Sequence, residues 1–206
     1  MSKLLLASTN PGKIREYRFL FDNLGYQMVT LAEEGITKVV TEPGNSYEQN
    51  AQLKATTYAK LSRFITIADD SGLEVDALSG EPGIYSARFA GKDATDADKV
   101  DSLLARLSAV PWEKRTAHFK CVIAIVTPSG QLELCYGERH GTIALETRGE
   151  NGFGYDPVFY LPELGETMAE LPLEVKNQVS HRAQAAFRAR QVLQRLHTQP
   201  IDHHNH

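Results

Sequence analysis

One stretch in the middle of the chain constrains the fold more than any other. An apolar run, Phe64–Ala68, stops abruptly at Asp69-Asp70-Ser71-Gly72. Aromatic and β-branched residues that end in an acidic, glycine-containing segment are typical of a buried strand entering a turn. In open α/β sheets, ligands bind beyond the carboxyl ends of such strands. The two carboxylates are therefore either turn formers and helix caps, or groups that hold a hard cation such as Mg²⁺ and act as a general base.

The composition narrows the class of protein. A chain of 206 residues with 42% hydrophobic and 23% charged residues is typical of one soluble domain with a substantial core. The net charge of −4 gives no reason to expect a nucleic-acid polymer as partner. The first apolar run, Leu4–Ala7, is too short for a signal peptide or a membrane span. Cys121 and Cys135 lie in apolar surroundings, which favours buried, reduced thiols. We expect a cytoplasmic protein that binds no membrane.

The first forty residues predict a phosphate-type loop. Residues 3–7 are expected to form a buried strand, and the polar loop Ser8–Lys13 follows at once. Asn10 is a suitable N-cap and Pro11 a suitable first residue for a helix that Gly25 ends. Unpaired N–H groups at a helix N-terminus favour anions. Lys13 opposes the helix dipole there, so it is either simply solvated or explained by a bound phosphate. The P-loop spacing is absent.

The remaining pattern predicts an α/β fold with a mixed sheet. Strands are expected at residues 27–31, 64–68, 116–127, 132–147 and 158–160, and helices at 47–61, 93–107, 171–179 and 180–196. The turn Pro128-Ser129-Gly130 predicts that two of these strands form an antiparallel hairpin. Lys54 is expected off the apolar side of its helix, and Ser180 is a plausible N-cap. Residues 1–197 are expected to form one domain, and the His-rich residues 198–206 a disordered tail.

The polar and aromatic residues of these loops together suit a nucleoside triphosphate. Cationic groups would bind the phosphates, carboxylates a divalent ion that bridges them, and aromatic rings the base. The candidate cations are Lys13, Lys176, His181 and Arg182, the candidate metal ligands Glu42, Asp69 and Asp70, and the candidate aromatic surface Phe153 and Tyr155. His181 and Arg182 would oppose a helix dipole, which suggests a bound partner. Residue types alone thus indicate a Mg²⁺-dependent nucleotide enzyme.

Five motifs occur in an order that resembles a known family. They are Ser8-x-Asn10-x-x-Lys13, Ala68-Asp69-Asp70-Ser71-Gly72, Pro82-Gly83-Ile84-Tyr85-Ser86-Ala87-Arg88, Gly152-Phe153-Gly154-Tyr155-Asp156-Pro157 and Ser180-His181-Arg182. The chain resembles the inosine/xanthosine triphosphate pyrophosphatases, also called Ham1-like proteins, over roughly residues 3–196. The resemblance implies a homodimer, an elongated mixed sheet and a cleft between two α/β lobes.

The resemblance also implies an activity and site residues. Members hydrolyse deaminated purine nucleoside triphosphates (ITP, dITP, XTP) to the monophosphate and pyrophosphate. By motif, Asp70 is the proton acceptor with Asp69 beside it, and Mg²⁺ is held by Asp70 and Glu42, for which Glu48 is a competitor. The implied substrate-binding residues are Ser8, Thr9, Asn10, Pro11, Gly12, Lys13, Ser71, Phe153, Gly154, Tyr155, Asp156, Lys176, His181 and Arg182. The first six and Lys176 would hold phosphates, with Ser71 beside them. Phe153–Asp156, His181 and Arg182 would read the base.

Two alternatives stay open at this point. One is a pyrophosphatase for a pyrimidine or another modified nucleoside triphosphate, and the other is a nucleotide-binding protein without catalysis. The adjacent acids Asp69 and Asp70 argue against the second, because binding alone does not require a base.

Overall fold

A mixed sheet runs the length of the molecule. The computed structural model describes residues 2–41 and 45–198, and this part contains a seven-stranded sheet in the order β2-β1-β3-β4-β5-β6-β7. The strands are β1 Lys3–Leu6, β2 Gln27–Thr30, β3 Ile65–Val75, β4 Thr116–Val126, β5 Leu132–Ile143, β6 Phe159–Leu161 and β7 Glu166–Thr167. The helices are α1 Pro11–Leu20, α2 Tyr47–Ser62, α3 Asp96–Arg106, α4 Leu173–Val179 and α5 His181–Thr198.

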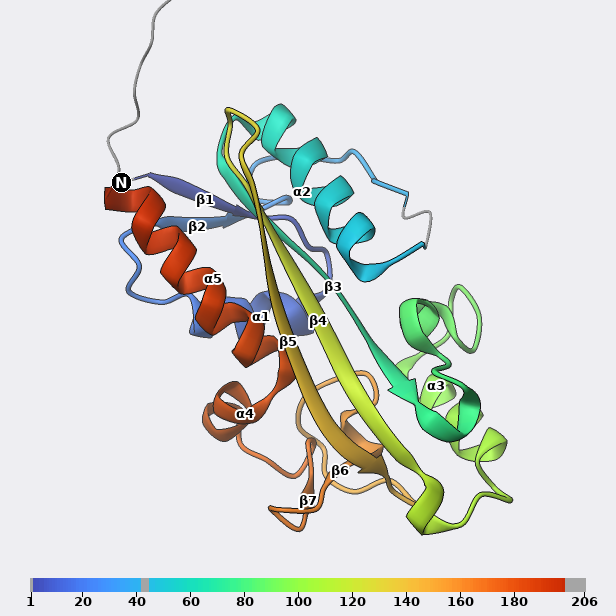
Figure 1. Ribbon diagram of the computed structural model, residues 1–206. Helices are drawn as coiled ribbons and strands as arrows, with labels where there is room; N and C mark the ends of the chain where they lie inside the picture. The colour runs from blue at the N-terminus through green and yellow to red at the C-terminus, as the bar shows by residue number, and fades with distance from the viewer. Residues whose placement is uncertain (1, 42–44, 199–206) are drawn as a thin grey trace, which may run out of the picture.

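The strand directions confirm the predicted fold class. β1 pairs with β2 and β3 in parallel, whereas β3, β4 and β5 are successive antiparallel neighbours. Strands β3, β4 and β5 form the long axis of the molecule, and helices lie on both sides of them (Figure 1). The hairpin predicted at residues 128–130 joins β4 to β5.

The strand that carries the two acids is longer than the sequence predicted. Asp69 and Asp70 were expected at its end, in a turn, but β3 continues through them to Val75. The reason is β4, which pairs with β3 along its whole length from Thr66 to Val75. On the other edge, β1 pairs with β3 only as far as Ile67. The acids therefore lie within a strand, at the point where β1 ends and leaves the edge of β3 open.

The two faces of the sheet are covered by different helices. On one face, residues of α1 and α5 pack with Ile67, Cys121 and Ile123. On the other face, α2 packs against Ala68 and Val122. Because successive strand residues point to opposite faces, Asp69 is directed towards α1 and α5, and Asp70 towards α2.

Several local predictions are confirmed. Asn10 caps α1, accepting a hydrogen bond from the Lys13 N–H at 3.0 Å, and Pro11 is the first helical residue. The Ser180 hydroxyl accepts from the Ala183 N–H at 3.1 Å at the start of α5. Both cysteines are buried, free thiols. The first helix ends at Leu20, several residues before the predicted Gly25.

None of the described helices combines the length and apolar character needed to cross a membrane.

Candidate active site

A cleft of about 680 Å³ opens where the edge of β3 is uncovered. Thirteen of the predicted site residues line it: Ser8, Thr9, Asn10, Lys13, Asp69, Asp70, Ser71, Phe153, Gly154, Tyr155, Asp156, His181 and Arg182. Gly12 and Lys176 line an adjoining pocket of about 160 Å³ that also touches Phe153. Pro11 and Glu48 line neither space. Glu42, the second predicted metal ligand, lies outside the described residues.

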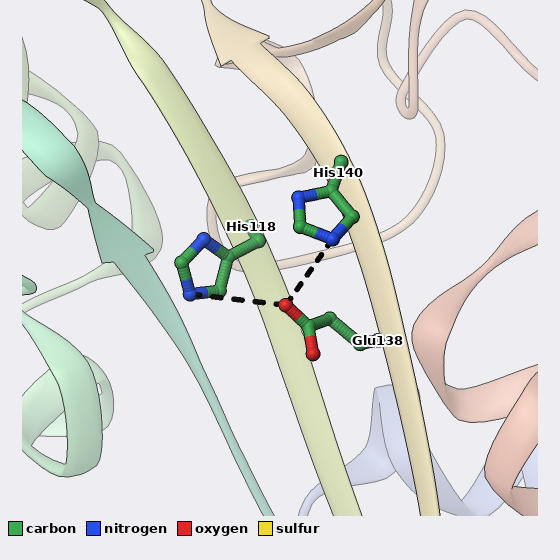
Figure 2. A group of neighbouring side chains, drawn as sticks. All are labelled: His118, Glu138 and His140. Atoms are coloured by element: carbon green, nitrogen blue, oxygen red, sulfur yellow. Dashed lines mark ion pairs between the residues drawn. The ribbon is translucent and has the colours of Figure 1, made fainter.

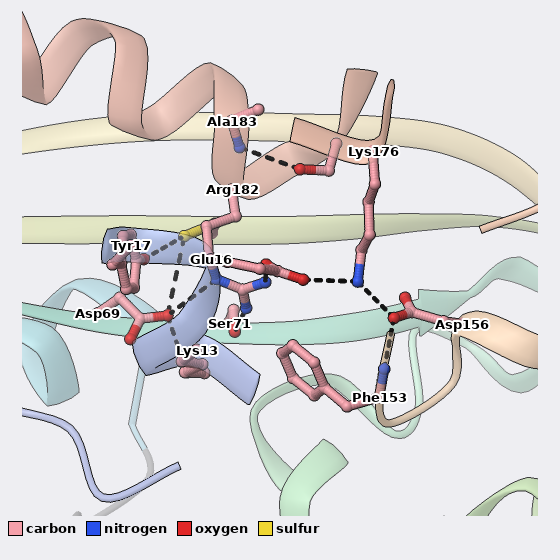
Figure 3. Close-up of polar contacts among 12 residues, drawn as sticks. Lys13, Glu16, Tyr17, Asp69, Ser71, Phe153, Asp156, Lys176, Arg182 and Ala183 are labelled. Atoms are coloured by element: carbon pink, nitrogen blue, oxygen red, sulfur yellow. Dashed lines mark hydrogen bonds and ion pairs between the residues drawn. The ribbon is translucent and has the colours of Figure 1, made fainter. Parts of the chain in front are cut away.

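The negative charge of the buried Asp69 is balanced by cationic side chains around it. The Lys13 ammonium lies 2.8 Å from its Oδ2, and Arg182 Nε lies 3.9 Å from the same oxygen (Figure 3). Burial by itself would raise the pKa of Asp69, but the charges of Lys13, Arg182 and Lys54 outweigh it and lower the pKa to about 2. The unfavourable position of Lys13 in the first turn of α1 thus has an explanation within the chain, in addition to any bound phosphate.

Asp70 has a different environment on the opposite face. Its Oδ2 accepts a hydrogen bond from the Asn50 side chain at 2.8 Å, and its Oδ1 accepts from the Ser71 N–H at 3.0 Å. Only 7% of the residue is exposed, yet it lines the cleft. Two neutral donors therefore orient this carboxylate and leave it directed to a space that a substrate can enter.

A buried ion network supports the cationic side of the cleft. Glu16, on α1, accepts from Arg182 Nη1 at 2.6 Å and from Lys176 Nζ at 2.7 Å (Figure 3). Lys176 is also paired with Asp156. Burial raises the pKa of Glu16, but the charges of Arg182 and Lys176 outweigh it and lower the pKa. The unfavourable position of Arg182 in the first turn of α5 thus has an explanation within the chain, the carboxylate of Glu16, in addition to any bound ligand.

Phe153 forms an aromatic wall over these cations. Lys176 Nζ lies 4.9 Å and the Arg182 guanidinium carbon 5.3 Å from its ring centre. The ring also lies against the start of α1, where a Cβ on Gly12 would stand 2.4 Å from it, so only glycine permits this approach. Asp156 Oδ2 accepts from the Phe153 N–H at 2.8 Å and fixes the loop.

Tyr155 is less available than predicted. It is almost fully buried, and its hydroxyl donates to the Ser86 carbonyl at 2.9 Å. It serves mainly to anchor the loop and offers the cleft little flat surface. Phe153 is the more accessible of the two aromatic residues.

His181 is not the cation that the sequence predicted. Burial lowers its pKa well below the usual value, and the charges of Arg182, Lys176 and Lys13 lower it further. The neutral ring stacks on Phe119, with centres 4.6 Å apart. Its buried Nδ1 has no hydrogen-bond partner among the described residues. A neutral imidazole with an unused polar atom, lining the cleft, can recognise an uncharged ligand group.

The sequence and the fold of the chain resemble those of known proteins. A sequence model described as the Ham1 family matches residues 4–192. The chain belongs to the Ham1 family. A dITP/XTP pyrophosphatase from Desulforamulus reducens is 48% identical over 95% of this chain and 97% of its own length. One from Bacillus subtilis is 41% identical over 94% of this chain and 98% of its own. A HAM1 protein structure from Coxiella burnetii has a TM-score of 0.85 at 40% identity, covering 95% of this chain and all (100%) of that one.

Sequence reasoning missed the contribution of α2 to this Ham1 site. Lys54, expected off the apolar side of the helix, is half-buried and donates to the Asp69 carbonyl at 2.6 Å. Asn50 is buried and holds Asp70. A signal was present, since Tyr47, Asn50, Lys54 and Tyr58 recur at helical spacing and form one polar-tipped stripe. A buried amide within such a stripe implies a partner. Glu16 could have been found in the same way, one turn after Lys13.

The donor set at Asp70 is suited to Mg²⁺. Magnesium is usually held by one or two carboxylates together with substrate phosphates and waters. Asp70 offers hard oxygen atoms at the cleft, and the loop Ser8–Lys13 lies across the same cleft, where a phosphate chain can complete the coordination.

Proposed function

We propose that this Ham1-family chain hydrolyses deaminated purine nucleoside triphosphates (ITP, dITP and XTP) to the monophosphate and pyrophosphate. The observation that carries the proposal is the placement of Asp70, whose carboxylate meets the cleft between the Ser8–Lys13 loop and the Phe153 wall. The names of the relatives, dITP/XTP pyrophosphatases at 41–48% identity, support the same substrate class.

The proposed roles follow from the two environments of the acids. Asp70 accepts a proton from a water molecule, which attacks the α-phosphorus, and pyrophosphate leaves as the bond to the β-phosphate oxygen breaks. Asn50 and the Ser71 N–H keep the accepting carboxylate in place. Asp69 holds Lys13 at the mouth of the phosphate loop. Lys13 and the N-terminal N–H groups of α1 bind the phosphate oxygens.

Mg²⁺ belongs to this proposal as the substrate's counter-ion. Asp70 would hold it, and Glu42 remains the predicted second ligand. When bound, the ion neutralises charge on the triphosphate.

Selection of the base rests on His181, Arg182 and Phe153. Inosine and xanthosine carry a carbonyl at position 6, where adenosine carries an amine. The unused Nδ1 of His181, protonated as one tautomer of the neutral ring, would donate to that carbonyl. Adenine would then leave a buried polar group unmatched, at a cost of about 1–3 kcal/mol. Guanine shares the carbonyl, so its exclusion must depend on position 2.

We also propose that residues 1–197 act as one catalytic unit and that the protein works as a cytoplasmic homodimer. The family resemblance supports the dimer, and the two buried, free thiols support a reducing compartment.

The decisive experiment is product analysis with dITP and Mg²⁺. We expect dIMP and pyrophosphate, and turnover of dITP about ten- to hundredfold faster than that of dATP, in keeping with one unmatched polar group. dGTP and dTTP serve as controls, and removal of Mg²⁺ by EDTA is expected to stop the reaction. Orthophosphate as the first product would refute the cleavage position. Faster turnover of dTTP or dATP than of dITP would refute the substrate class.

A further inference from the structure

A second cluster of metal-type ligands lies outside the cleft, on the β4–β5 hairpin. It consists of His118, Glu138 and His140. None of these three residues is among the described residues that line the cleft. We propose that these three side chains form a binding site for a divalent transition-metal ion of the Zn²⁺ type, separate from the Mg²⁺ chemistry of the active site.

The strand register explains why the three side chains meet. His118 on β4 is directly opposite His140 on β5, and Glu138 lies two residues before His140 on the same strand. Opposed residues of an antiparallel pair, and residues two apart on one strand, point to the same face. Two imidazoles and a carboxylate are thereby placed on one surface of a rigid hairpin (Figure 2).

The ligand atoms converge on one point. His140 Nε2 lies 3.3 Å and His118 Nε2 4.0 Å from Glu138 Oε1, and all three ligand atoms lie within 4.8 Å of one another. With metal–ligand bonds of about 2.0–2.2 Å, tetrahedral ligand atoms are about 3.2–3.6 Å apart. One pair already has this spacing. Rotation of side chains can supply the remaining contraction, because the side chains of His140 and Glu138 are 78% and 43% exposed.

The donor types select the class of ion. Imidazole nitrogen suits Zn²⁺, Cu²⁺ and Ni²⁺, whereas Mg²⁺ prefers oxygen. Two histidines and one glutamate are also the ligands of three-coordinate protein sites that leave the fourth position of zinc to water. The cluster on the hairpin therefore differs from Asp70 both in its ligand atoms, which include two imidazole nitrogens, and in its position outside the cleft.

The neighbouring charges are compatible with a cation. Lys120, which is directly opposite Glu138 in the strand register, is paired with Glu74 at 2.9 Å. Glu74 Oε2 also lies 3.0 Å from His118 Nε2. On metal binding, His118 Nε2 would exchange this contact for the ion, and Glu74 would stay beside it as a compensating negative charge.

The test uses the full chain with His203, His204 and His206 each changed to Ala, because those C-terminal histidines could bind metal themselves. Zn²⁺ is titrated by calorimetry, and Co²⁺ is used as a spectroscopic probe. We expect one Zn²⁺ per chain, visible d–d bands with Co²⁺, and a rise in Tm on adding Zn²⁺. His118→Ala and His140→Ala should each weaken Zn²⁺ binding more than tenfold and abolish the rise in Tm.

His197→Ala is the matched control, since it removes a histidine from α5 and should leave Zn²⁺ binding unchanged. Melting curves in EDTA show whether each variant folds, so that a folding defect is not counted as lost binding. Zn²⁺ binding that survives unchanged in both His118→Ala and His140→Ala would overturn the proposal. So would the absence of a one-to-one Zn²⁺ complex once the C-terminal histidines are removed.

Discussion

Asp69 and Asp70 are neighbours in sequence, yet they belong to two different environments. Asp69 is directed to the face covered by α1 and α5, where Lys13 and Arg182 compensate its charge. Asp70 is directed to the face covered by α2, where the Asn50 amide and a backbone N–H hold it. The strand alternation alone separates them, because one residue along β3 changes the face.

The two environments suit the two acids to different roles, a structural role for Asp69 and a chemical role for Asp70. A carboxylate whose pKa lies at about 2 is a poor proton acceptor near neutral pH, since it gains little by taking a proton. Asp69 is thus suited to holding cations in place. Asp70 is oriented by the Asn50 amide and the Ser71 N–H at the edge of the cleft, and there it is suited to accept a proton. Substitutions at each acid test whether the two carboxylates differ in this way.

The largest effect is expected at Asp70. Asp70→Asn keeps the size of the side chain but removes the accepting carboxylate, so turnover of dITP should fall about 10²–10⁴-fold. Nucleotide binding, measured by calorimetry with a non-hydrolysable analogue, should remain detectable. Glu74→Gln is the matched control, because it changes an acid on the same face of the same strand outside the cleft, and its turnover should stay close to that of the wild type. Full activity in Asp70→Asn would remove Asp70 from the role of base.

The effect at Asp69 should appear mainly in stability. Asp69→Asn leaves the Lys13 ammonium without its buried anion and leaves Arg182 with Glu16 alone, so the free energy of unfolding should fall by about 3 kcal/mol. Urea denaturation at pH 7 measures this loss. Glu33→Gln is the control, since it breaks an exposed 2.7 Å pair with Arg18, and such pairs contribute about 0–1 kcal/mol. Equal losses in the two variants would mean that Asp69 does not anchor the cationic side of the cleft.

The sequence predicted much of the fold because its signals are local. Asn10 with Pro11, Ser180 and the turn at residues 128–130 each act within a few residues, and the structure confirms all of them. The continuation of β3 past Asp69 depends instead on β4, some fifty residues later, whose pairing outweighs the local turn signal. Local propensity cannot report such a pairing.

The sequence predicted which residues line the site, but not the charge state or the ion-pair partners of their side chains. Motifs brought together Lys13, Asp70 and Phe153, which do line one cleft. The charge state of His181 could not be read from its type, because it depends on burial next to Arg182 and Lys176. The same holds for Lys176, whose charge is shared between Glu16 and Asp156 in a contact that only the fold creates.

The smallest effect expected is the acid dependence of stability. Asp69 has a folded pKa of about 2, below its ordinary value of 3.8, so its contribution is present above about pH 4 and is lost as the pH falls towards 2. The shift corresponds to about 2 kcal/mol. In urea denaturation from pH 7 to pH 3, the gap between wild type and Asp69→Asn should narrow below pH 4. Lys13→Met removes the largest of the charges that lower this pKa, so the loss should begin at a higher pH. A gap that stays constant down to pH 3 would show that the cations do not hold Asp69 ionised.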